Sequence, residues 1–279
     1  DMALPSRRMP ISIQRAIGNQ DSYEGPFGVG WDFNYNQRLT ELDPLSFPLG
    51  LQMPLIIRST RDDSDIAGSQ DVLFNTGMGR VLRFRWVSTN IPPEYAADPL
   101  VKELKYEGLV SDYYLPAPGQ GIFDLLVKFR DGRFERLTPD GVRYRYAGTG
   151  RLEMIIDRFP LNRHELEYDR NDWLVRIDDK SVRGPRYVDF GYYRTAEDPD
   201  FREGLDELTT HSPWSGKIRR LRNYAGGEVL FVYSSDGFLI RRDGFQVDGE
   251  NSGFSGRAQT HYLYKNCRFA GIQVTGKGT

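Results

Sequence analysis

Turn-forming residues divide this chain into short segments. Glycine recurs about every ten residues, and 13% of the 279 residues are aromatic. Short runs of β-branched and aromatic residues lie between Asp-Gly, Asn-Asp and Gly-Gly pairs, a pattern typical of antiparallel strands joined by tight turns. The pattern predicts an all-β fold of consecutive antiparallel β-hairpins.

Four hairpins can be delimited in the sequence. Residues 125–130 and 133–137 flank Asp131-Gly132, where glycine supplies the positive φ of a tight turn. The other predicted hairpins pair 142–146 with 152–156, 164–168 with 173–177, and 229–233 with 238–241. Apolar residues at alternate positions, such as Leu152, Met154 and Ile156, indicate that one face of the sheet is covered and the other is wet.

Two short helices are predicted beside the strands. Asp98 followed by Pro99 fits a helix N-cap and first turn. Phe201, Leu205 and Leu208 have the spacing of one helical face. Neither segment is long, so we expect one or two helical decorations on a β fold.

Charge and cysteine content exclude several classes of protein. The 37 basic residues nearly balance the 39 acidic ones, so no global field recruits nucleic acid or an anionic membrane. The single cysteine, Cys267, excludes an internal disulfide and a multi-cysteine metal site. No apolar run reaches the about 18 residues of a membrane span, and residues 1–20 carry no signal-peptide core. Because the first residue is Asp1, we expect a piece of a longer polypeptide.

The hairpin turns share a motif of Tyr, three residues, Asp or Gly, a bulky residue, and Leu. Copies begin at Tyr146, Tyr168 and Tyr233, and a degenerate copy begins at Phe190. Tyr ends the outgoing strand, Asp, Asn or Gly makes the turn, and Leu begins the return strand. The repeat residues predicted to be structural are Tyr146, Gly150, Arg151, Leu152, Tyr168, Asp169, Leu174, Tyr233, Gly237 and Leu239.

The spacing of these copies indicates an insertion. Tyr146, Tyr168 and Phe190 follow at intervals of 22 residues, but Tyr233 comes 43 residues after Phe190. A segment at about 195–215 accounts for the excess, and it holds six acidic residues, one Arg and no Lys. We predict an acidic insertion at a hairpin tip.

These repeats resemble the Rhs/YD-repeat family, whose unit is close to Tyr-Asp-x-x-Gly-Arg-Leu. The start of the chain is similar to the segment that opens the repeats in Rhs polymorphic toxins: an apolar strand ending in Arg15 precedes a Gly-Pro-x-Gly-x-Gly-Trp element at 25–31. The resemblance implies structural roles in this opening for Arg15, Gly25, Pro26, Gly28, Gly30, Trp31, Arg38 and Leu39.

The resemblance bears on the architecture of the chain more than on its chemistry. In this family, and in the related shells of Tc toxins and teneurins, YD hairpins lie side by side as a curved sheet, part of a hollow β-shell around a C-terminal toxin. Residues 1–125 would be an opening segment of irregular strands and loops, and residues 126–279 a YD-repeat sheet, together forming one continuous unit. We therefore expect the N-terminal wall of such a shell.

The resemblance also implies partners and a location. The partners would be the following repeats and the enclosed toxin of the same parent protein, with secretion-apparatus components as a further class, and no nucleic acid or membrane span. The parent would be made in the bacterial cytoplasm and exported as part of a secreted toxin in competition between bacteria. Any toxin or self-cleavage activity would lie outside this segment.

No catalytic, cofactor-binding or metal-binding residue is assigned. The sequence contains no phosphate-binding loop, nucleophile elbow or zinc helix. His164, His211 and His261 are interpreted as two strand residues and a loop residue. The acidic cluster at 62–65 fits only part of a calcium loop, which favours a solvated loop. The basic stretch at 217–222 is interrupted by Ile218 and Leu221, which favours a strand with a core face over a nucleic-acid surface.

Two alternatives from other classes stay open. The Tyr, Trp and Phe content fits a carbohydrate- or receptor-binding β-module on a cell surface, since aromatic rings have apolar faces that stack. A β-rich hydrolase would need two carboxylates in one pocket with pKa values pushed apart, and sequence spacing does not reveal such a pair.

Overall fold

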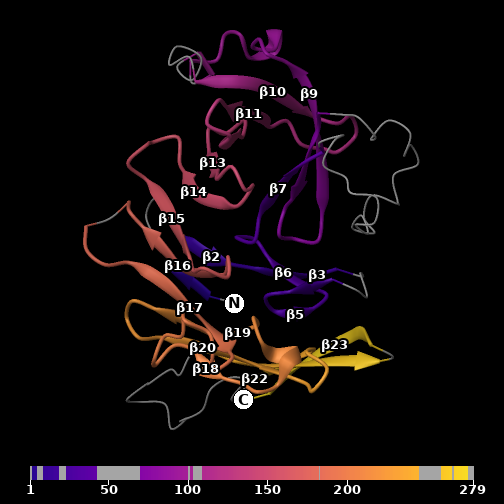
Figure 1. Cartoon of the computed structure of the whole chain (residues 1–279), viewed down its shortest axis with the longest axis vertical. Coiled ribbons are helices and arrows are strands. Elements are labelled where there is room, and N and C mark those ends of the chain that lie inside the picture. Colours follow the sequence, from indigo (N-terminus) through magenta and orange to yellow (C-terminus); the bar gives the residue numbers. More distant parts are fainter. Residues whose placement is uncertain are drawn as a thin grey trace. The chain divides into compact units, whose positions relative to one another are not determined.

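The fold is all-β, as predicted (Figure 1). The structure, a computed structural model, describes residues 2–4, 9–18, 23–42, 70–99, 101–102, 109–181, 183–244, 259–265 and 267–275. The chain forms two compact units. We call Asn36–Leu161 the middle unit, and Asp1–Tyr35 with Asn162–Thr279 the split unit. The predicted boundary near residue 125 stays a prediction.

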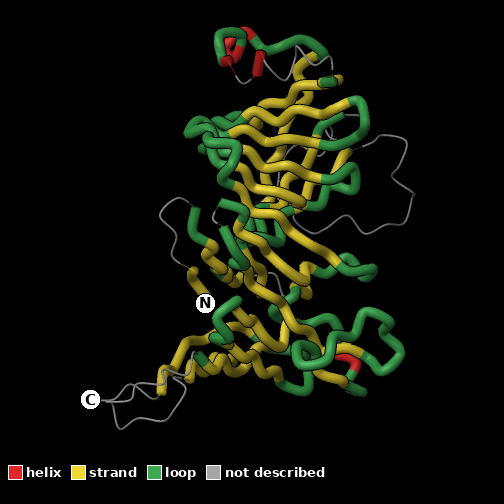
Figure 2. Tube along the Cα trace, turned by 90° about the vertical axis from the view of Figure 1, so that its left-hand side faces the viewer, coloured by secondary structure: helices red, strands yellow, loops and turns green. Residues whose placement is uncertain are grey.

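The middle unit is a sheet in which each strand pairs antiparallel with the next along the chain (Figure 2). Its strands are β7 (Arg38–Glu41), β8 (Val72–Asn75), β9 (Val81–Ser88), β10 (Val110–Pro116), β11 (Leu125–Phe129), β12 (Phe134–Leu137), β13 (Arg143–Tyr146) and β14 (Leu152–Ile156). A single 3-10 turn, η3 (Pro93–Tyr95), lies among the described residues between β9 and β10.

The split unit has the same chain-order pairing in its second part. There the strands are β15 (Arg163–Tyr168), β16 (Leu174–Asp179), β17 (Tyr187–Arg194), β18 (Glu207–Leu208), β19 (Ile218–Asn223), β20 (Glu228–Tyr233), β21 (Leu239–Asp243), β22 (Gln259–Lys265) and β23 (Arg268–Thr275), with η4 (Ser212–Trp214) before β19. These strands pair antiparallel, except that the two-residue β18 pairs parallel with the end of β17. The rest of β17 pairs antiparallel with β19.

The first residues of the split unit form three small pairs of strands. They are β1 (Met2–Leu4) with β2 (Ile11–Ile13), β3 (Arg15–Ile17) with β6 (Trp31–Phe33), and β4 (Glu24–Gly25) with β5 (Gly28–Val29). Aromatic rings pack these short strands on the sheet: the Phe27 centroid lies 4.9 Å from that of Phe231, and the Phe33 centroid 5.8 Å from that of Phe190. All four rings are buried, so the opening residues supply one layer of this unit's core.

All four predicted hairpins are present, as β11–β12, β13–β14, β15–β16 and β20–β21. Gly132 has the predicted positive φ, +88°. Alternation of burial is regular in β20 and imperfect in β14, where Ile155 is buried as well as Leu152 and Ile156.

One of the two predicted helices is wrong. Residues around Asp98 do begin a helical turn: Asp98 Oδ1 accepts the Val101 N–H at 3.3 Å, as an N-cap does. The segment 201–208 instead forms turns and β18. The Asp206 carboxylate accepts the backbone N–H groups of Tyr192 and Arg202, at 2.7 and 2.8 Å, so its side chain competes with helix formation.

The acidic cluster at 62–65 and residues 5–8 of the opening lie outside the described residues. Within the part of the chain that the structure describes, no helix is long and apolar enough to cross a membrane.

Candidate functional site: the hairpin tips and the opening segment

The repeat motif folds into one recurring piece of backbone. We call each segment from the motif Tyr to the residue that begins the return strand a hairpin tip. In every tip these two residues are paired, and a bulge directly precedes the Tyr. The pairs are Tyr146 with Leu152, Tyr168 with Leu174, Tyr192 with Ile218, and Tyr233 with Leu239.

Two backbone hydrogen bonds close each tip. The residue after the Tyr donates its N–H to the carbonyl of the residue just before the Leu or Ile. The residue two before the Leu or Ile has a positive φ and donates its N–H to the carbonyl of the residue after the Tyr. This is a turn followed by a left-handed residue, which joins strands with a bulge. The cross-tip donors and acceptors are Ala147 to Arg151 (2.8 Å), Asp169 to Trp173 (3.0 Å), Tyr193 to Lys217 (2.9 Å) and Ser234 to Phe238 (2.8 Å). The left-handed residues are Gly150, Asp172, Gly216 and Gly237.

The third tip is assigned to Tyr192, whereas the sequence pattern placed the degenerate copy at Phe190. Tyr192 pairs with Ile218 and Gly216 has φ +79°, so the closing geometry is complete. The inserted residues, 194–215, lie inside the closing bonds. The inserted residues therefore lie within a hairpin tip.

Tyrosine hydroxyls fasten neighbouring strands at the tips. The hydroxyls of Tyr192, Tyr233 and Tyr264 donate to the carbonyls of Leu174, Ile218 and Leu239 at 2.9, 2.7 and 2.9 Å. Each acceptor is the first residue of the strand that precedes the tyrosine's own strand. Burial raises the pKa of Tyr192 and Tyr233 above the ordinary value, so both hydroxyls keep the proton that they donate.

Tyr146 uses its hydroxyl differently. It donates to Gln37 Oε1 at 2.8 Å and lies 3.4 Å from Arg136 Nε. Burial raises the pKa of Tyr146 to about 12, and the Arg136 guanidinium opposes that shift. The residue is fully buried, so it acts as a hydrogen-bonded core residue of the middle unit.

Arg15 of the opening motif lies in an aromatic cage. Its guanidinium carbon is 4.9 to 5.2 Å from the ring centroids of Phe27, Trp31, Phe231 and Tyr262. It also donates to the Tyr262 hydroxyl. Burial lowers the pKa of Arg15, with opposing contributions from Tyr262. Two rings come from the opening motif and two from β20 and β22, so Arg15 joins the opening to the repeats.

The Gly-rich element of the opening lies directly on a hairpin tip. Gly28 has φ +97°, and a Cβ at this position would overlap the Gly237 carbonyl. The Ile218 N–H donates to the Pro26 carbonyl at 2.7 Å, and the Trp31 indole donates to the Tyr264 hydroxyl at 2.9 Å. Gly28 is thus needed for the close approach of the two backbones.

A second contact of this kind occurs in the middle unit. The Leu39 N–H donates to the Gly150 carbonyl at 2.8 Å, and Arg38 forms a β-bridge with Arg151. A Cβ on Gly150 would overlap the Leu39 carbonyl. The opening residues therefore contact the glycine of a tip in both units, Gly237 in the split unit and Gly150 in the middle unit.

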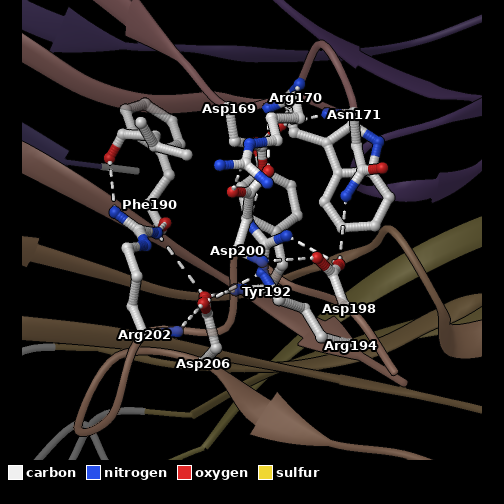
Figure 3. A network of polar contacts seen from close by, with 12 residues as sticks. Asp169, Arg170, Asn171, Phe190, Tyr192, Arg194, Asp198, Asp200, Arg202 and Asp206 are labelled. Atoms are coloured by element: carbon white, nitrogen blue, oxygen red, sulfur yellow. Dashed lines mark hydrogen bonds and ion pairs between the residues drawn. The ribbon is translucent and has the colours of Figure 1, made fainter. Parts of the chain in front are cut away.

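A buried ion cluster fixes the inserted tip (Figure 3). The Arg194 side chain is 0% exposed and pairs with Asp169, Asp198 and Asp206 at 2.5, 2.7 and 2.9 Å. Its guanidinium carbon lies 4.8 Å from the centroid of the Trp173 ring, which stacks on Tyr192. Asp169 comes from the neighbouring tip, so the cluster ties the insertion to the hairpin before it.

Sequence reasoning identified Asp169 but missed Arg194, Asp198 and Asp206 as partners. The available signal was an acidic insertion beginning directly after an arginine at the end of a strand. Arg202 extends the network by donating to the carbonyls of Phe190 and Val175. The cation at the centre of these carboxylates is a side chain of the protein itself.

The other residues considered in the sequence have structural partners. His164 Nε2 lies 3.1 Å from the Met9 carbonyl, and His211 Nε2 lies 2.7 Å from the Ser235 carbonyl. In the basic stretch Ile218 and Leu221 are fully buried, as predicted for a strand with a core face. Its cations pair with carboxylates, as Lys217–Glu24, Arg219–Glu207 and Arg220–Glu228 at 2.5, 2.6 and 3.1 Å. Among the described residues no group of three His, Cys, Asp or Glu is arranged to hold a metal ion.

Comparisons with known proteins identify no family for this chain. No family model matches the chain, and no curated protein matches it. Among solved structures, a chain in the crystal structure of TcdB2-TccC3-TEV is similar over 79% of this chain, with 12% identity and a TM-score of 0.17. The similar region covers 15% of that chain. At this TM-score the likeness does not establish a shared fold.

Proposed function

We propose that this chain is the N-terminal wall of an Rhs/YD-type shell, which encloses a toxin polypeptide until delivery. The observation that carries the proposal is the recurrence of one tip geometry at Tyr146, Tyr168, Tyr192 and Tyr233. Repeated supersecondary units that pair only with their neighbours are the way extended protein walls are built. In this role the chain acts by enclosing and catalyses no reaction.

The tips and the opening segment would have separate tasks in such a wall. Antiparallel hydrogen bonds between consecutive hairpins hold the sheet together, and buried tyrosine hydroxyls lock adjacent strands at their ends. The opening segment lies on the tips at Gly150 and Gly237, so it covers residues that would otherwise be exposed. The partners in this proposal are the following repeats and the enclosed toxin of the same parent, with secretion components at export from a bacterial cytoplasm.

The reading frame around this sequence tests the proposal first. We expect further Tyr-to-Leu units after the chain and, beyond them, a C-terminal segment that varies among related proteins. A frame in which the chain is joined to unrelated domains, with no further units, contradicts the shell.

Limited proteolysis of the parent protein tests enclosure itself. We expect the segment after the repeats to resist protease in the native parent and to be cleaved once the repeats are unfolded by denaturant. Cleavage of that segment in the native parent contradicts enclosure. Specific binding of this chain to a glycan array, combined with unprotected downstream sequence, would instead support the carbohydrate-binding alternative.

A further inference from the structure

A large groove lies in the middle unit, away from the tips and the opening motif. Its volume is about 1170 Å³. One wall is η3 and the helical turn after it, another is the loop at 115–123, and a third is the turn at 137–143 with Arg158 and Pro160. None of the repeat or opening residues lines it, so the shell proposal does not explain it.

Specific contacts hold the walls in place. The Tyr95 hydroxyl donates to the Phe123 carbonyl at 3.0 Å, which joins the first wall to the second. Gln120 Oε1 accepts the Arg83 N–H at 3.1 Å and anchors the loop to β9. The groove is thus formed without a ligand, as binding sites usually are.

The groove combines an apolar interior with charges of opposite sign on different walls. Leu137 belongs to a buried hydrophobic cluster and Leu115 packs against it, and Phe123, which is 76% exposed, lines the same groove. Glu94 and Asp98 lie on the first wall. Arg143 and Arg158 lie on the third.

We infer that this groove binds an extended polypeptide segment of a partner protein. The segment would place a large apolar side chain against Phe123 and would carry a basic residue toward Glu94 and Asp98 and an acidic residue toward Arg158. Aromatic residues and arginine are both enriched at protein-binding surfaces. The volume exceeds the roughly 300–1000 Å³ of small-molecule pockets, which leaves room for several residues.

Other ligand classes fit this groove less well. Acidic side chains on one wall repel the phosphates of nucleic acid. Five of the lining residues are prolines, which lack an N–H donor: Pro99, Pro116, Pro118, Pro139 and Pro160. A sugar with many hydroxyl groups would therefore find few backbone donors, whereas the apolar proline rings suit apolar side chains of a peptide.

A displayed library of random dodecapeptides, selected on the full chain, tests the inference. We expect enriched peptides to contain an aromatic or large aliphatic residue with charges of both signs near it. A synthetic enriched peptide should bind Phe123→Ala roughly ten-fold or more weakly in fluorescence anisotropy, because the buried ring contact is lost. It should bind Arg158→Glu more weakly too, and replacing the acidic residue of the peptide by Lys should restore that binding.

Controls separate a local effect from unfolding. Phe123 is exposed, so its substitution should leave the circular dichroism spectrum and the unfolding midpoint unchanged. Phe201→Ala, which removes a ring 38% exposed in the split unit, should leave peptide binding unchanged. Absence of enrichment, or enriched peptides that bind Phe123→Ala as tightly as the original chain, overturns the inference. Glycan-array binding that Phe123→Ala abolishes overturns it as well, in favour of a sugar site.

Discussion

The tips at Tyr146 and Tyr192 have the same closure and very different lengths. In the first, Gly148 and Thr149 separate Ala147 from the left-handed Gly150. In the second, residues 194–215 separate Tyr193 from the left-handed Gly216. In both tips the Tyr follows a bulge and pairs with the first residue of the return strand. The closure, and not the loop, therefore sets the register of the repeat.

A long tip must be closed and must also have its inserted backbone held in place. Closing a loop of some twenty more residues costs only roughly 2 kcal/mol of chain entropy, since the cost rises with the logarithm of length. The backbone of the insertion must still be held, because a polar loop has few apolar contacts of its own. In the long tip the ion cluster around Arg194 holds the backbone of the insertion. The short tip has only two residues inside its closing bonds and needs no such cluster.

Removing Arg194 should have the largest effect, because the cluster holds only the long tip. Arg194→Ala removes the guanidinium shared by the buried carboxylates of Asp169, Asp198 and Asp206, and only Asp206 keeps Arg202 at 3.5 Å, so the free energy of unfolding should fall by about 3–5 kcal/mol. Urea unfolding followed by tryptophan fluorescence measures this. Arg170→Ala, at a side chain 79% exposed, is the matched control and should change stability by less than about 0.5 kcal/mol. Similar small losses in both variants would contradict a structural role for the cluster.

Two glycines with nearly equal φ differ in what surrounds them, and their substitution should have the next largest effect. Gly150 (φ +79°) is touched by the Leu39 carbonyl, whereas Gly119 (φ +82°) has open space around its Cα. Gly119→Ala should cost about 1 kcal/mol from the left-handed backbone alone. Gly150→Ala should cost at least twice that, because β7 must also move. Equal losses in thermal or urea unfolding would show that the opening segment does not press on this tip.

A smaller loss is expected from a single hydroxyl. Tyr233→Phe leaves the buried Ile218 carbonyl without its hydroxyl donor and should lower the free energy of unfolding by about 1–2 kcal/mol. Tyr224→Phe, at a residue 45% exposed, should cost nearly nothing. If the two variants unfold at the same urea concentration, the hydroxyl bonds do not fasten the strands.

The smallest effect is a pH dependence at the base of the β15–β16 hairpin. Burial lowers the pKa of His164 below 6.5; the nearby Asp179 opposes the shift and Arg186 adds to it. The folded state therefore disfavours the protonated imidazole, and the free energy of unfolding should fall as pH drops below about 6.5. His164→Gln should remove this slope, as measured by unfolding at a series of pH values. A slope that survives the substitution assigns it to another group.

The ion cluster at the tip of the same hairpin should respond in a separate pH range. Burial alone would raise the pKa of Asp198, but hydrogen bonds from the Asp200 N–H and Arg194 lower it on balance. This contribution is present above the ordinary Asp pKa of about 3.9 and is lost as pH falls below it. The two slopes should therefore be separable.

Local signals predicted the hairpins, because their geometry is decided within a few residues. Asp131-Gly132 and the Tyr-to-Leu motif indicated the turns, and the positive φ values lie at Gly132, Gly150 and Gly237. The insertion could also be predicted, because the spacing of the motif copies alone reveals it. What failed was the helix at 201–208, where apolar spacing suggested a face but the Asp206 side chain bonds to backbone N–H groups instead.

Long-range packing could not be predicted from the sequence. Arg15 and Tyr262 are neighbours in the structure and almost a whole chain apart in sequence, and nothing local pairs them. The same holds for Asp169 with Arg194, whose contact depends on how the insertion folds back. The resemblance pointed to Arg15 and Asp169 as structural residues without indicating their partners.

Amide hydrogen exchange can show whether one closure is repeated in all four tips, since it measures protection of the cross-tip N–H in each copy. The donors are the N–H groups of Ala147, Asp169, Tyr193 and Ser234. We predict that all four exchange slowly, including Tyr193 despite the long insertion that follows it, while exposed Ala196 within the insertion exchanges fast. Exchange at Tyr193 as fast as at Ala196, with the other three protected, would contradict a single repeated closure.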